Sequence, residues 1–124
     1  MDAYYIVNDT NDPIAVKATE IRKQEYLFWR EVKPDLEDDF DISCHTLSAR
    51  TGLSERRTRD ITMALYRLAE LPLTKALQET YYFLDFSRLI TIDAVLSKLG
   101  DIPTEILERI DQELARYLTP TKPG

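Results

Sequence analysis

Arginine side chains gather in one short stretch of this 124-residue chain. Residues 43–68 contain five arginines and two acids, a net charge of +3, whereas residues 1–42 carry −6 and residues 69–124 carry −3. Guanidinium groups bind phosphates through paired hydrogen bonds and can recognise guanine in the major groove of DNA. The stretch is therefore a candidate site for an anionic partner. The overall charge of −6 disfavours non-specific coating of nucleic acid but leaves room for a small, directed contact.

The spacing within residues 47–61 predicts a helix-turn-helix. Gly52 can take the positive φ that ends the first helix, Leu53 is expected to fill the angle between the helices, and Ser54 can cap the second helix. The small side chain of Ser48 allows the helices to cross closely. Residues expected on the buried face of the second helix recur every three or four positions: Thr58, Ile61, Leu65 and Leu68.

The opposite face of that second helix is expected to meet DNA. At 100° per residue it carries Arg56, Arg59, Met63 and Arg67. The N-terminal part of such a helix enters the major groove, so Arg56 and Arg59 are expected to reach base edges of double-stranded DNA. Arg50 and Arg57 are expected to contact phosphates, and the amides after Ser54 offer an anion site. The predicted DNA-binding residues are Arg50, Ser54, Arg56, Arg57, Arg59 and Met63.

A second interpretation of the same two helices is a non-catalytic module that binds protein. Glu55 and Asp60 flank the arginine face and would repel phosphate, and the chain has no basic tail. Met63 and Tyr66 could then form an apolar contact patch. The alternative partners are a second copy of the chain or a downstream nuclease domain.

An acidic segment, residues 37–41, precedes the predicted first helix of this pair. It lacks the glycine and the alternating ligands of a calcium loop, so a solvated connector is the expectation. A less favoured interpretation places it beside the arginines, where its carboxylates would screen them.

Catalytic and cofactor-binding patterns are not evident in the sequence. The single cysteine, Cys44, stands next to the single histidine, His45, and neighbouring side chains on a helix point in different directions. We therefore expect no enzyme activity, no metal site and no cofactor in these residues. A lone cysteine fits a reducing cytoplasm, and no apolar run reaches the roughly 18 residues of a membrane helix.

Helix signals run through the rest of the chain and predict an all-α, compact bundle of five to six helices, one domain over residues 1–118. Asp12 and Pro34 bracket a helix over residues 13–33, with Trp29 in the core. Residues 1–10 are interpreted as an extended arm that packs on the helical body. The expected apolar face of the first helix comprises Ile14, Ala18, Ile21, Phe28 and Val32.

The C-terminal half is expected to hold a short helix near residues 75–78, a helix closed by Gly100 and a last helix that opens at Pro103. Residues 119–124 are interpreted as a flexible end or the start of a linker. Aromatic residues expected in the core are Tyr81, Tyr82, Phe83 and Phe86. The apolar face of the last helix is expected to comprise Ile106, Leu107, Ile110, Leu114, Tyr117 and Leu118.

From residue 47 onward the chain resembles the thirteen-E-twelve repeat family, over roughly two-thirds of its length. The similar segments are Leu-Ser-Ala-Arg-Thr-Gly-Leu-Ser-Glu-Arg-Arg-Thr-Arg at residues 47–59, Leu-Ala-Glu-Leu-Pro at 68–72 and Leu-Thr-Pro at 118–120. The family is an actinobacterial domain of unknown function, commonly N-terminal to an HNH endonuclease module. Residues 80–85 depart from its pattern, since they lack the glycine and histidine usual there.

The resemblance implies a helical accessory domain of a nuclease-like or mobile-element protein. The histidine and asparagine signature of the nuclease module is absent, so no catalytic residue carries over. Whether the chain is a fragment of a longer protein is left open by the sequence.

Overall fold

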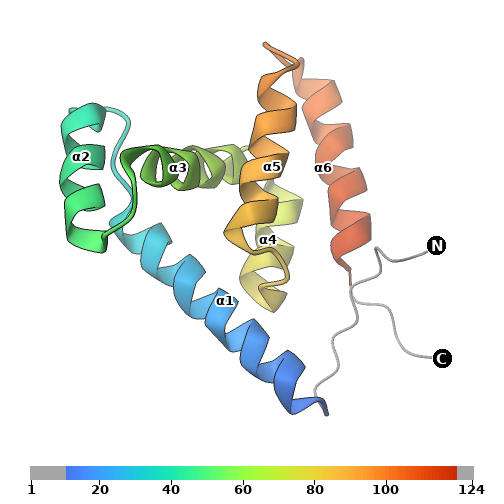
Figure 1. The fold of residues 1–124 in the computed structure, drawn as a ribbon. Helices are drawn as coiled ribbons and strands as arrows, with labels where there is room; N and C mark the ends of the chain where they lie inside the picture. Colours follow the sequence, from blue (N-terminus) through green and yellow to red (C-terminus); the bar gives the residue numbers. More distant parts are fainter. Residues whose placement is uncertain (1–10, 120–124) are drawn as a thin grey trace.

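A computed structural model describes residues 11–119 of the chain, and this part is built from helices alone (Figure 1). The helices are α1 (Pro13–Val32), α2 (Phe40–Thr51), α3 (Glu55–Ala69), α4 (Pro72–Tyr81), α5 (Phe86–Ser97) and α6 (Thr104–Leu118). The predicted all-α fold with five to six helices is confirmed. The predicted arm at residues 1–10 and all but the first residue of the predicted flexible end lie outside the described residues.

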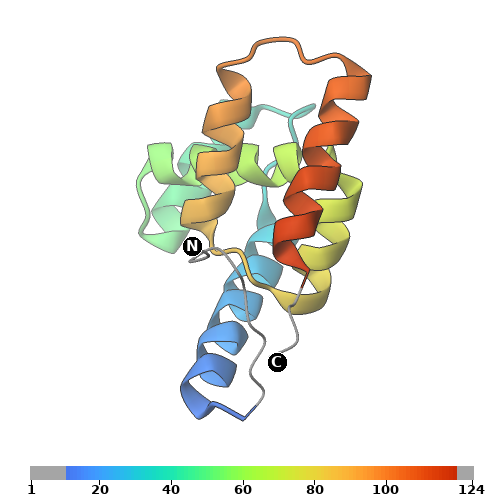
Figure 2. The same cartoon turned by 90° about the vertical axis from the view of Figure 1, so that its right-hand side faces the viewer.

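Helix α3 runs through the middle of the molecule and contacts α1, α2, α4 and α5. Figures 1 and 2 show α2 standing steeply across the N-terminal end of α3, while the antiparallel α5 and α6 lie at its other end. Helix α1 extends away from this body at its N-terminal end. The buried core includes the predicted Trp29 and is formed by Tyr26, Trp29, Ile61, Ala64, Leu65, Leu68, Phe83, Leu84, Phe86, Leu89 and Leu118.

Capping residues set most of the helix boundaries. Asp12 accepts a hydrogen bond from the Ile14 amide at 2.9 Å, as expected from the sequence, and Asp85 caps α5 in a similar way. Gly100 has φ +67°, and Pro103 immediately precedes α6 instead of lying in its first turn. Helix α4 is longer than the predicted residues 75–78, because Pro72 starts it directly after α3.

The predicted apolar face of α1 is right only for Ala18 and Val32, which are half-buried. Ile14 and Ile21 are 79% and 62% exposed and Phe28 is also exposed, whereas Tyr26 and Trp29 are buried. The first turns of α1 project beyond the body, and none of the other described helices covers them (Figure 2). Only the second half of the helix meets the core, through Tyr26, Leu27, Trp29 and Val32.

Helix α6 also differs from its predicted face. Four of the expected side chains are buried or half-buried: Leu107, Ile110, Leu114 and Leu118. Ile106 and Tyr117 are exposed, because the side of α6 that faces α4 is the one that carries Leu107 and Asp111. In the predicted aromatic cluster Phe83 and Phe86 are buried, while Tyr81 and Tyr82 are half-buried.

The loop between α4 and α5 is held by a buried side-chain amide. The Gln78 Nε2 donates to the Leu84 carbonyl at 2.9 Å, and its Oε1 accepts from the Leu84 N–H at 2.9 Å. The side-chain amide of Gln78 thus satisfies both backbone polar groups of Leu84, its N–H and its carbonyl. Tyr82, at the start of this loop, takes the left-handed conformation with φ +54°.

We expect Gln78→Ala to lower the free energy of unfolding by about 2–3 kcal/mol, because it leaves a buried N–H and a buried carbonyl without partners. Urea denaturation followed by circular dichroism measures this. Gln112→Ala, at an exposed position of α6, is the matched control and should change stability by less than about 0.5 kcal/mol. Equal effects of the two substitutions would contradict the role of the Gln78 amide.

Candidate nucleic-acid interface

Helices α2 and α3 form the two-helix unit predicted for residues 43–69, joined by three residues. Gly52 takes φ +78°, and its N–H donates to the Ser48 carbonyl at 3.0 Å to end α2. Ser54 begins α3, since its Oγ accepts from the Arg57 N–H at 3.0 Å. Helix α2 begins at Phe40, earlier than the predicted Ser43.

The inside of this unit differs in one respect from the prediction. Leu53, expected to fill the angle between the helices, is 38% exposed and so is not part of the buried core. Its carbonyl accepts from the Ser48 Oγ at 2.5 Å, so the small Ser48 acts as a hydrogen-bond donor to the turn. The residue that α2 buries is Cys44. The predicted buried face of α3, by contrast, is confirmed: Thr58, Ile61, Leu65 and Leu68 are all buried.

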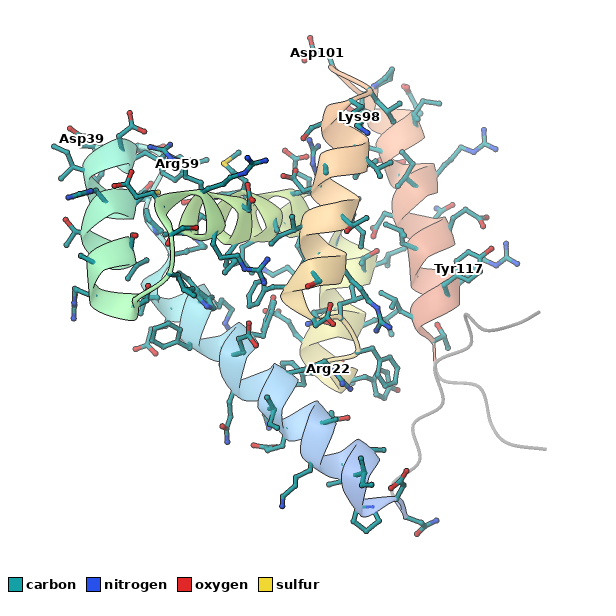
Figure 3. The ribbon with its side chains drawn as sticks, viewed as in Figure 1. Arg22, Asp39, Arg59, Lys98, Asp101 and Tyr117 are labelled. Carbon is teal, nitrogen blue, oxygen red and sulfur yellow. The ribbon has the colours of Figure 1, made fainter. Side chains whose placement is uncertain are left out.

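Arg56 and Arg59 both leave α3 near its N-terminal end, but their surroundings differ. Arg56 is exposed and has no ion pair among residues 11–119. The Arg59 Nη2 donates to the Asp41 Oδ1 of α2 at 2.5 Å, and its guanidinium lies 5.4 Å from the centre of the Phe40 ring. Figure 3 shows Arg59 directed toward the N-terminal end of α2. One of the two predicted base-reading arginines is therefore already bound to an acid.

The other predicted contact residues lie on both helices of the unit and in the turn between them. Arg50 is exposed in the last turn of α2, Arg57 is half-buried in the first turn of α3, and neither has an ion pair within the described part of the chain. Met63 is 39% exposed, two turns along from Arg56. The side chain of Ser54 is used as the helix cap. Its anion-binding role therefore rests on the amides of Glu55 and Arg56, which have no carbonyl partner at a helix start.

Arg67, placed on the exposed face by the helical period, is instead part of the packing between α3 and α5. Its side chain is 19% exposed and donates to Asp93 of α5 at 3.0 Å and to Glu70 at 2.9 Å. Because α5 crosses the C-terminal half of α3, only the N-terminal half of the arginine face remains accessible.

Tyr66 does not form an exposed patch with Met63. Its hydroxyl donates to the Pro34 carbonyl at 3.0 Å and accepts from the Leu36 N–H at 3.2 Å, and Lys33 Nζ lies 4.4 Å from the ring centre. These contacts hold the connector between α1 and α2 against α3. The helical periodicity of the sequence could not predict these contacts of Tyr66, since its partners are backbone groups some 30 residues away.

The acidic segment at residues 37–41 has two structural roles. Asp39 caps α2, accepting from the Ile42 N–H at 3.2 Å, and Asp41 in its first turn binds Arg59. The expectation of a solvated connector is therefore wrong for Phe40 and Asp41, which belong to α2. The less favoured interpretation, in which an acid screens an arginine, is right for Asp41.

Chemistry at Cys44 and His45 is limited by their surroundings. Cys44 is fully buried, and burial raises the pKa of its thiol, which disfavours the reactive thiolate. His45 is exposed and hydrogen-bonded through Nδ1 to Glu55 at the start of α3.

Within residues 11–119, no three His, Cys, Asp or Glu side chains are grouped to hold a metal ion. No helix in the same residues is long and apolar enough to cross a membrane.

Comparison with known proteins does not assign this surface. No family model, no curated protein and no solved structure matches the chain, and the resemblance to the thirteen-E-twelve repeat family stays a prediction.

Proposed function

We propose that α2 and α3 form a DNA-binding module that places the first turns of α3 in the major groove of double-stranded DNA. The observation that carries this proposal is Arg56, an exposed arginine without an acidic partner in the described residues. It stands on the N-terminal half of α3, which a helix-turn-helix inserts into DNA. A role as an accessory domain beside a nuclease module, as the family resemblance implies, is part of the same proposal.

Each arginine has a distinct part in the proposed complex. Arg56 reads base edges, Arg50 and Arg57 bind phosphates on either side, and the free amides at the start of α3 add a further anion contact. Arg59 joins only after leaving Asp41. Since the rest of the chain is acidic, the contact is small and its affinity modest.

Fluorescence anisotropy with a labelled random-sequence duplex tests this function. Two to three phosphate contacts should give a slope of log affinity against log salt of about −2 to −3, at about −0.9 per contact. Absence of binding at low salt with hundreds of micromolar protein would overturn the proposal. A duplex selection on the chain would then identify any preferred sequence.

Asp41→Asn is expected to strengthen DNA binding by roughly threefold to tenfold. The substitution removes an exposed ion pair worth up to about 1 kcal/mol, together with a negative charge close to the incoming phosphates. Asp101→Asn, which makes the same charge change at an exposed position in the α5–α6 loop (Figure 3), is the matched control. Equal affinities of the two variants would show that Asp41 does not compete with DNA.

A helical protein-interaction module is the second candidate, and the exposed apolar side chains of α1 favour it. Ile14, Val16 and Ile21 are all at least half exposed on the projecting first turns. Light scattering over a wide concentration range should then detect self-association, and Ile14→Ser with Ile21→Ser should abolish it. A molar mass that stays that of the monomer at every concentration would contradict self-association through α1.

A further inference from the structure

Between α5 and α6 lies an apolar groove that none of the described helices fills. Helix α5 packs mainly on α3, and α6 packs mainly on α4, although the two run side by side in Figures 1 and 2. The groove has a volume of about 610 Å³ and is lined chiefly by Leu84, Arg88, Ile92, Leu114, Tyr117 and Leu118. Walls of this kind are suited to the apolar face of a further helix.

One face of α5 extends the groove along the helix. Arg88, Ile92 and Val95 lie on this face at spacings of four and three residues, and Leu99 continues the series four residues later, in the turn after α5. Val95 and Leu99 are more than half exposed. Arg88 is exposed too, and its guanidinium makes a long contact of 3.4 Å to the Phe83 carbonyl but no ion pair within residues 11–119. The α5 stripe, from Arg88 to Leu99, thus begins with an unpaired cation and continues with three apolar side chains.

A complementary stripe is exposed on the first half of α1. Counting back from Glu25 at spacings of four, three and four residues gives Ile21, Ala18 and Ile14. The two isoleucines are largely exposed on the projecting turns, and Ala18 is half-buried. Glu25 is exposed and has no ion pair in the described part of the chain. The α1 stripe, from Ile14 to Glu25, therefore ends with an unpaired acid.

We propose that the α1 stripe of one copy packs on the α5 stripe and the adjoining groove of a second copy, with the two helices antiparallel. The contacts, with the α1 residue first and the residue of the second copy after it, are Glu25–Arg88, Ile21–Ile92, Ala18–Val95 and Ile14–Leu99. Both stripes cover eleven residue steps, about 16 Å, so all four contacts form in one register. This proposal goes beyond DNA binding and rests on the second candidate function, self-association through α1, for which it supplies the partner surface.

Charge and apolar area have different parts in this contact. Removal of the exposed isoleucine, valine and leucine side chains from water drives the association. The ion pair sets its direction, because a parallel α1 would place Glu25 beside Leu99 and leave Arg88 beside Ile14. Since each copy carries both stripes, two copies contact each other twice and form a closed dimer.

Charge reversal in the full-length chain tests this assignment. Glu25→Arg alone and Arg88→Glu alone each bring like charges together at both contacts, so each variant should dimerise at least about tenfold more weakly than the wild type. In a mixture of the two variants, one contact pairs the two reversed residues and the other pairs the two native residues. Dimerisation of the mixture should therefore return to within about threefold of the wild type.

Sedimentation velocity with fluorescence detection measures these affinities, with labelled Arg88→Glu titrated by each unlabelled protein. Glu31→Arg is the matched control for Glu25→Arg, because it makes the same charge change at an exposed position on another side of α1. Alone it should dimerise within about threefold of the wild type. Mixed with Arg88→Glu it should restore nothing, since Glu25 still meets the new glutamate.

The possible outcomes separate this contact from its alternatives. A wild type that stays monomeric at every concentration, or a mixture no tighter than its separate components, would overturn the proposal. Loss of association in Ile14→Ser with Ile21→Ser but not in Glu25→Arg would leave self-association through α1 standing and overturn the α5 stripe as its partner. None of these residues is a proposed DNA contact, so DNA binding by α3 is judged separately.

Discussion

Asp111→Ala is expected to lower the free energy of unfolding by about 3–4 kcal/mol, the largest stability loss that we predict for a single side chain. Asp111 lies on α6 and is 4% exposed. Its carboxylate accepts from the Leu73 N–H at 2.9 Å, the Thr74 N–H at 2.8 Å and the Thr74 Oγ1 at 2.7 Å. The substitution leaves the Leu73 and Thr74 N–H groups without an acceptor, and the Thr74 hydroxyl keeps only its long contact of 3.4 Å to the Asp111 carbonyl.

The reason for this large effect is that Asp111 caps a helix to which it does not belong. Leu71, at the N-cap position of α4, has no side-chain acceptor, and Pro72 follows it. Asp111 therefore supplies both the missing acceptor and a negative charge at the positive end of the α4 dipole. A single carboxylate thus joins α4 to α6 and ends the turn after α3.

Urea denaturation of the wild type, Asp111→Ala and Asp111→Asn measures this. Asparagine retains one acceptor oxygen and should give an intermediate loss. Glu108→Ala, an exposed acid of the same helix, is the control and should cost less than about 0.5 kcal/mol. An Asp111→Ala loss below about 1 kcal/mol would contradict the cross-helix cap.

Local signals in the sequence predict the helices well, because caps and periodicity act over a few residues. Asp12, Gly52 and Ser54 perform the expected roles at helix ends, and α3 buries the expected face. The side of α1 that meets the core could not be derived in this way. It depends on how far the helix projects beyond the body, which is a tertiary property.

The buried role of Asp111 could have been predicted from its position in the sequence. It stands in line with Leu107, Leu114 and Leu118 at spacings of four, three and four, so an acid interrupts the apolar stripe of α6. An acid in that position needs buried donors, and the uncapped start of a helix after Leu71 offers them. Only the fold, however, brings these two segments together.

The candidate interface shows the same division between local and tertiary information. The positions of Arg56 and Arg59 on one face of α3 follow from the helical period alone. The ion pair between Arg59 and Asp41 joins residues 18 positions apart, and the withdrawal of Arg67 depends on α5. The sequence therefore predicts which arginines are candidates, and the structure separates the free arginines from those already paired.

Arg56→Ala combined with Arg59→Ala is expected to weaken DNA binding by about 30-fold or more. A good contact of an arginine with a base edge contributes about 1–3 kcal/mol, so two contacts of intermediate strength contribute about 4 kcal/mol. The ion pair that Arg59 gives up offsets up to about 1 kcal/mol, and at least about 2 kcal/mol, or 30-fold, remains. Arg56 contributes the larger part, since Arg59 must first leave Asp41. The fold should be unaffected, because Arg56 makes no ion pair in the described residues and the pair of Arg59 is an exposed one.

The most direct test of the proposed DNA-binding face compares this double variant with Arg109→Ala combined with Arg116→Ala. The second protein loses the same two charges from exposed positions of α6, so non-specific electrostatic attraction falls equally in both. Anisotropy with a selected duplex at fixed salt should show the loss of about 30-fold only for the α3 variant, with less than about threefold for the α6 variant. Equal affinities of the two variants would contradict a DNA contact through α3.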